Sequence, residues 1–159
     1  MVTTISLKDQ VLDSAREVFE TMVFMALEEA QEEGPQMEDK TLLGTITFKG
    51  QLEGCLGICC GVHCARTVAA NMLGMDPSEA ISEDDVNDAV GEVANMVMGA
   101  VKARIQDQVG SMDVSIPSVV QGLELKNSLG DKASEVVVNG SLEDEHLIRF
   151  SLLYRENNS

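Results

Sequence analysis

The chain has 159 residues, of which 44% are hydrophobic and 24% are charged, as is usual for one globular domain. It carries 27 acidic and 11 basic residues, which give a formal net charge of −16. This charge opposes binding to nucleic acids and to anionic membranes. The aromatic content of 3% also argues against a surface that stacks on bases. An anionic ligand would therefore have to arrive with its own cations.

The N-terminus has no basic segment followed by an apolar one, and no apolar run reaches the ~20 residues of a membrane span. We therefore expect a cytoplasmic protein with reduced thiols. Four cysteines lie in the segment CLGICCGVHC, together with His63: Cys55, Cys59, Cys60 and Cys64. Their spacing lacks the paired C-x2-C motifs of structural zinc sites. We expect buried cysteines in an apolar strand, with a metal or thiol redox protein as the alternative.

Three segments have helical signals. Residues 11–33 are predicted to form a long helix that ends at Gly34, and residues 65–73 form a short one. A second long helix begins at Ser82, whose hydroxyl can cap it. Strand signals, with Gly50 as a turn residue, occur at 41–60, where two strands are expected, and at 112–116, 123–126, 136–138 and 146–153.

The two long helices match each other at an offset of 75 residues. Six apolar positions of the first coincide with six of the second: Val11, Ala15, Val18, Phe19, Met22 and Ala26 with Val86, Val90, Val93, Ala94, Val97 and Val101. Strand signals follow both helices. We therefore predict one domain over residues 1–159, built from two duplicated halves at about 7–61 and 82–153.

One side of the second long helix carries a line of polar residues. Because successive helical residues are ~100° apart, Asp88, Glu92, Asn95 and Gly99 lie in a narrow sector opposite the apolar stripe. Such a sector is commonly just a solvated face. Two details favour a docking face. Glu92 and Asn95 are neighbours at i, i+3. A mid-helix glycine costs about 1 kcal/mol against Ala, but it lets another molecule approach the backbone.

The pattern Asp88-x3-Glu92-x2-Asn95 resembles the E-x2-N signature of the CheC/CheX/FliY chemotaxis phosphatases. That signature continues to a proline, and Pro117 is similar in position and context. CheC-type members carry two such copies and CheX-type members carry only the second. In the first helix the matching positions hold Glu17, Glu20 and Phe24, so the chain resembles the CheX type.

The resemblance implies an α+β fold, with the two long helices packed on a mainly antiparallel sheet. It also implies hydrolysis of the phospho-aspartate of a CheY-like response regulator. Asn95 would position the attacking water, and Glu92 would form a salt bridge with a lysine of the regulator. Asp88 and Gly99 are expected to contact this partner. No metal or cofactor of its own is expected, because the regulator would carry the Mg²⁺ and the lysine that neutralise the phosphate.

A binding module that docks a response regulator without hydrolysing its phosphate is the alternative function. The resemblance leaves a homodimer open, and we expect neither nucleic acid nor membrane as a partner. The sequence does not identify the response regulator or the output of its pathway. It also does not say whether the four cysteines do more than pack.

Overall fold

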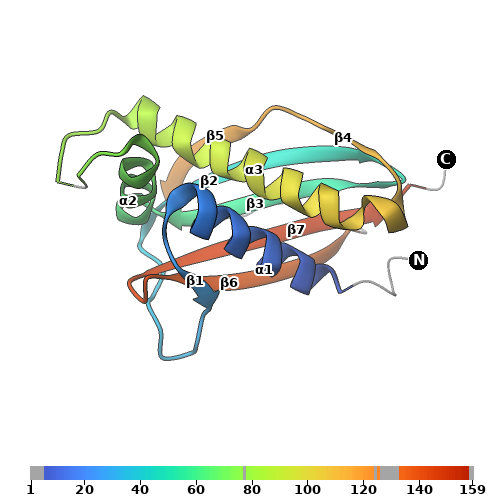
Figure 1. The fold of residues 1–159 in the computed structure, drawn as a ribbon, viewed down its shortest axis with the longest axis horizontal. Coiled ribbons are helices and arrows are strands. Elements are labelled where there is room, and N and C mark those ends of the chain that lie inside the picture. Colours follow the sequence, from blue (N-terminus) through green and yellow to red (C-terminus); the bar gives the residue numbers. More distant parts are fainter. Residues whose placement is uncertain (1–5, 77, 124, 126–132, 158–159) are drawn as a thin grey trace.

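The computed structural model describes residues 6–76, 78–123, 125 and 133–157. These residues form three helical regions and one sheet (Figure 1). Helix α1 (Leu7–Val18) continues into a turn of π-helix, η2 (Phe19–Val23), and is followed along the chain by α2 (Val62–Leu73) and α3 (Glu83–Val109). The strands are β1 (Leu27–Glu29), β2 (Lys40–Gly50), β3 (Leu52–Gly61), β4 (Met112–Val114), β5 (Ser118–Leu123), β6 (Ser134–Leu142) and β7 (His146–Glu156).

The sheet has the order β1-β6-β7-β3-β2-β4, and β5 also pairs with β2. All of these pairings are antiparallel. Two hairpins, β2–β3 and β6–β7, meet at the centre of the sheet where β3 pairs with β7. Each half of the chain contributes a helix, an edge strand and a hairpin. The edge strand of each half pairs with the hairpin of the other half, β1 with β6 and β4 and β5 with β2. The predicted α+β class is confirmed.

Helices α1 and α3 lie over the same face of the sheet, and α2 covers one end (Figure 1). The six apolar positions predicted for the second long helix are all buried between α3 and the sheet. Phe19 of η2 meets Phe150 of β7 edge to face, with ring centroids 6.1 Å apart. The core therefore sits between one helical layer and one sheet, which leaves the outer side of α3 exposed to solvent.

The first long helix is shorter than predicted. It ends at Val23 instead of Glu33, and Phe24 after it adopts a left-handed conformation with φ 62°. Residues Leu27–Glu29 then form β1, in which Leu27 is fully buried opposite Leu142. The apolar spacing continues through Met22, but this residue is 52% exposed. Pairing with β6 outweighs the local helix preference of this segment.

The edge strand beside β2 also differs from the prediction. Strand β4 stops at Val114, and β5 begins at Ser118 directly after Pro117, whose missing N–H confines it to strand starts, bulges and edges. The strand predicted at 123–126 is wrong, because β5 ends at Leu123, and residues 124 and 126 lie outside the described residues. The other predicted strands and both remaining helices are present, and most extend beyond their predicted limits. No helix of the described residues is long and apolar enough to cross a membrane.

Candidate functional site on the exposed face of α3

Helix α3 begins at a well-defined N-cap. The Ser82 hydroxyl accepts a hydrogen bond from the backbone N–H of Asp85 at 3.1 Å, as predicted. Three acidic residues occupy the first turn, Glu83, Asp84 and Asp85, where the positive end of the helix dipole stabilises them. The cap and the buried stripe together fix the rotation of the helix about its axis. They therefore also fix which residues face solvent.

Asp88, Glu92, Asn95 and Gly99 are all exposed on the outer side of α3. A Cβ atom built on Gly99 would have nothing within 4 Å. The predicted free face of this helix is therefore confirmed, and the space above Gly99 is open. The roles of the four residues in docking or chemistry stay predictions.

The polar groups of this line are available to a partner. Within the described part of the chain, Asp88, Glu92 and Asn95 have no hydrogen bond or ion pair through their side chains. The carboxylate of Glu92 can accept hydrogen bonds, and the amide of Asn95 can both donate and accept. A ligand can therefore bind both groups without first breaking an internal contact.

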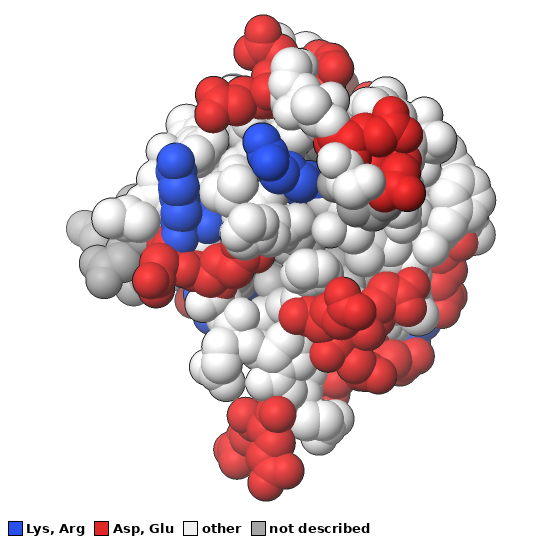
Figure 2. Space-filling view, turned by 90° about the vertical axis from the view of Figure 1, so that its left-hand side faces the viewer, with Lys and Arg blue, Asp and Glu red and all other residues white. Residues whose placement is uncertain are grey.

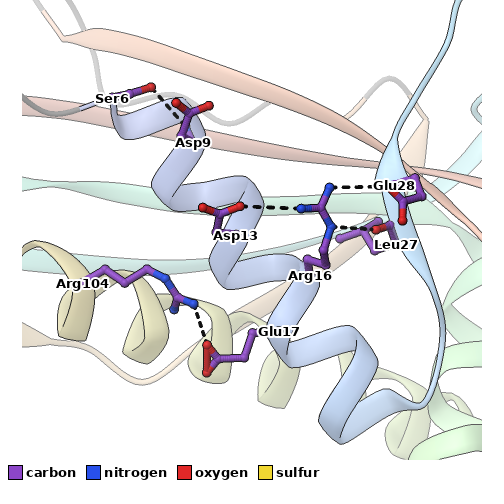
Figure 3. A network of polar contacts seen from close by, with 8 residues as sticks. All are labelled: Ser6, Asp9, Asp13, Arg16, Glu17, Leu27, Glu28 and Arg104. Carbon is purple, nitrogen blue, oxygen red and sulfur yellow. Dashed lines mark hydrogen bonds and ion pairs between the residues drawn. The ribbon is translucent and has the colours of Figure 1, made fainter.

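The matching residues of α1 are engaged in internal contacts, as Figure 3 shows. The carboxylate of Glu17 lies 2.6 Å from the guanidinium of Arg104 and joins α1 to α3. Asp13 lies 3.6 Å from Arg16, which also contacts Glu28. Because Glu20 stands at the position that matches Asn95, and because Arg104 holds the carboxylate of Glu17, α1 and η2 offer no second site of the same kind.

A buried glycine that the sequence analysis did not single out lies next to the polar line. Gly91 of α3 lies beneath Pro117 and Val119, and a Cβ atom built on it would lie 3.4 Å from Cγ of Pro117. Because Gly91 has no side chain, the segment between β4 and β5 can run close to α3. The closest approach lies one helical turn before Asn95. The sequence does contain a signal for this close approach, because Gly91 is a second glycine in the middle of the helix.

The four cysteines are buried, and none of them takes part in a disulfide. Side chains alternate along β3, so Cys59 and Cys60 point to opposite faces of the sheet. A hydrogen bond to Cys64 and burial raise the pKa of Cys60 well above its ordinary value, and burial raises that of Cys59. Raised values disfavour the reactive thiolate. No three His, Cys, Asp or Glu residues among those described are placed to hold a metal ion. The geometry favours packing over the metal or redox alternative.

A comparison with protein families finds the family described as chemotaxis phosphatase CheX, whose model matches residues 42–139. The chain belongs to the CheX family. The matched region includes nearly all of the hairpin β2–β3, all of α3 and Pro117. The resemblance drawn from Glu92 and Asn95 is thereby confirmed.

Solved structures of CheX and related proteins share this fold. CheX from Vibrio vulnificus is 24% identical, with a TM-score of 0.78 over 95% of this chain and 97% of that one. A CheC-like superfamily protein from Shewanella sp. PV-4 is 25% identical, with a TM-score of 0.76 over 94% of this chain and 97% of that one. CheX in a CheX–CheY–BeF3–Mg²⁺ complex from Borrelia burgdorferi is 20% identical, with a TM-score of 0.71 over 96% of this chain and 99% of that one. A search of curated proteins finds no match.

Proposed function

We propose that this CheX-family chain hydrolyses the phospho-aspartate of a CheY-like response regulator, with Glu92 and Asn95 as the residues that act on it. The observation that carries the proposal is the placement of these two polar side chains on one exposed helix face, beside the open space at Gly99 and without a partner among the described residues. The Borrelia relative was solved in complex with CheY, which supports a regulator as the partner. The proposal places this chain in the cytoplasm, with its substrate.

The chemistry of phosphoryl transfer fits such a sparse site. The reaction needs little covalent help from the protein, and catalysis comes mainly from positioning and from neutralising charge. In the proposed step, the Asn95 amide orients a water molecule that attacks phosphorus while the aspartyl oxygen leaves. A neutral amide adds no negative charge beside the phosphoryl group, whereas a carboxylate at this position would repel it.

The cations in the proposed reaction come with the substrate. The regulator would supply Mg²⁺ and a lysine, and Glu92 would bind that lysine and hold the two proteins in register. The Borrelia complex contains Mg²⁺, which is consistent with a metal ion on the regulator. Asp88 and Gly99 would form the rest of the contact face, Asp88 through its carboxylate and Gly99 through the absence of a side chain.

The test is phosphate release from a purified CheY-like protein phosphorylated by a small-molecule donor in the presence of Mg²⁺. We expect the wild-type chain to accelerate release and Asn95→Ala to lose roughly 100-fold in rate. The fold should persist, because an exposed substitution usually changes stability by less than about 0.5 kcal/mol. Gln106→Ala is the matched control, since Gln106 is an exposed amide on the same helix about three turns later.

Two results would contradict this proposal. If Asn95→Ala kept nearly the wild-type rate, the amide would not orient the nucleophile. If the wild-type chain bound the phosphorylated regulator without releasing phosphate, the chain would be a binding module instead of a phosphatase.

A further inference from the structure

The edge of the sheet next to α3 contains a bulge. Strand β4 ends with Val114 opposite Phe48, and β5 begins with Ser118 opposite Thr45. Three residues of the edge chain, 115–117, therefore run past only two residues of β2. An extra residue of this kind bends an edge strand and re-aims its side chains.

The bulge is held on both sides. The backbone N–H of Ser115 donates a hydrogen bond to the carbonyl of Thr47 at 2.9 Å. The hydroxyl of Ser115 accepts one from the backbone N–H of Thr47, also at 2.9 Å. The same hydroxyl donates to the carbonyl of Ile116 at 3.0 Å. On the other side, Pro117 packs against Gly91 of α3. The backbone of Ile116 is thus fixed between two anchored residues.

Ile116 is an apolar side chain that the bulge turns into solvent. It is 86% exposed, more than any other large hydrophobic residue in the described part of the chain. An exposed isoleucine alone would need no explanation. The backbone of Ile116 is fixed and its β-branched side chain has few rotamers, so binding a partner would cost this residue little conformational entropy. Because Gly91 and Asn95 are i, i+4 neighbours, the bulge borders the polar line on the side of Asn95.

We infer that Ile116 is an apolar contact for the phosphorylated response regulator, adjoining the polar contacts made by Glu92 and Asn95. The inference rests on the proposed function, and the continuity of Ile116 with the polar line identifies the occupant. A regulator seated over Asn95 would also cover the bulge, and an apolar patch beside its phosphorylation site would bury Ile116. A few buried anchors commonly carry most of the affinity of such interfaces.

The test measures hydrolysis kinetics and direct binding for Ile116→Ser. We expect KM to rise about tenfold while kcat stays within about twofold, because the residue contacts the partner and not the reacting atoms. Binding to the regulator activated with beryllofluoride and Mg²⁺ should weaken by the same factor, and thermal stability should not change. Val120→Ser is the matched control. Val120 is 52% exposed on the same edge, but its neighbour Val119 faces Gly91, so Val120 points away from α3.

The outcomes separate this inference from the proposed function. An active wild-type chain whose Ile116→Ser variant keeps the wild-type KM and affinity overturns the inference alone. If the wild-type chain binds the activated regulator without hydrolysis, the proposed function fails. In that case a tenfold loss of affinity in Ile116→Ser still supports the inference, and an unchanged affinity overturns it. A wild-type chain that does not bind overturns both.

Discussion

Glu92 of α3 and Glu17 of α1 occupy matching positions, yet their carboxylates have different surroundings. Glu17 is held by Arg104 at 2.6 Å, whereas Glu92 has no ionic partner in the described part of the chain. A docked regulator can therefore pair with Glu92 without breaking an internal contact, while pairing with Glu17 would break its ion pair with Arg104. At the two matching positions, one carboxylate is thus available for a partner and the other has a structural role.

The first prediction concerns this available carboxylate. Glu92→Gln should raise KM for the phosphorylated regulator by roughly tenfold with little change in kcat, because a pairing with lysine mainly governs docking. The effect should shrink as salt screens the pair. Steady-state kinetics at low and high ionic strength would measure this.

Glu20→Gln is the control for Glu92→Gln, because Glu20 is exposed and its substitution leaves the Glu17–Arg104 pair in place. It should behave as the wild type does. An unchanged KM with a collapsed kcat in Glu92→Gln would instead assign this carboxylate a chemical role.

At the scale of an element, the most informative position of α3 is Gly99. A Cβ atom there would meet nothing within 4 Å, so Gly99→Ala should stabilise the isolated protein by up to about 1 kcal/mol. Gly99→Phe should also fold, but its ring would occupy the space that we assign to the regulator, so activity should disappear. Thermal unfolding and phosphatase rate of both variants test this, with Gln106→Phe on the same helix as control.

Wild-type activity in Gly99→Phe would move the docking face away from this part of α3. Unfolding of either Gly99 variant would mean that a side chain at this position meets another element, contrary to the open space around it.

Phe24 ends the first helix in a conformation that glycine usually adopts. The backbone of Phe24 has φ 62° and ψ 40°, and its side chain is 69% exposed, so little burial offsets the strain. Phe24→Gly should therefore raise the free energy of unfolding by roughly 1 kcal/mol. Met22→Gly, at an exposed helical position two residues earlier, should lower it by about the same amount. Destabilisation by Phe24→Gly in urea unfolding would show that contacts of the ring outweigh the strain.

These elements also show what the sequence could predict. The exposed face of α3 follows from local periodicity and a capping serine, so Asp88, Glu92, Asn95 and Gly99 could be placed without the fold. Strand β1 could not, because it exists through pairing with β6, more than 100 residues later in the chain. The bulge at Ile116 likewise depends on its register with β2.

At the scale of the whole molecule, the surface is dominated by negative charge. Figure 2 shows acidic side chains in several clusters around the end of the molecule where α2 lies, with basic side chains among the uncharged residues between them. Among the described residues, ion pairs with lysine or arginine involve five carboxylates: Asp13, Glu17, Glu28, Glu29 and Glu53. Most of the 27 acidic residues therefore contribute repulsion that these contacts do not offset.

The last prediction follows from this repulsion. Raising NaCl from about 10 mM to about 200 mM shortens the Debye length from roughly 30 Å to less than 10 Å, so it should increase Tm by roughly 2–4 °C. Reversing the charge of two exposed loop residues, with Glu32→Lys and Glu33→Lys together, should raise Tm at low salt and reduce the salt response. Salt should weaken docking through Glu92 over the same range, so stability and KM should both increase. A Tm that stays constant or falls with salt would mean that self-repulsion does not limit the stability of this fold.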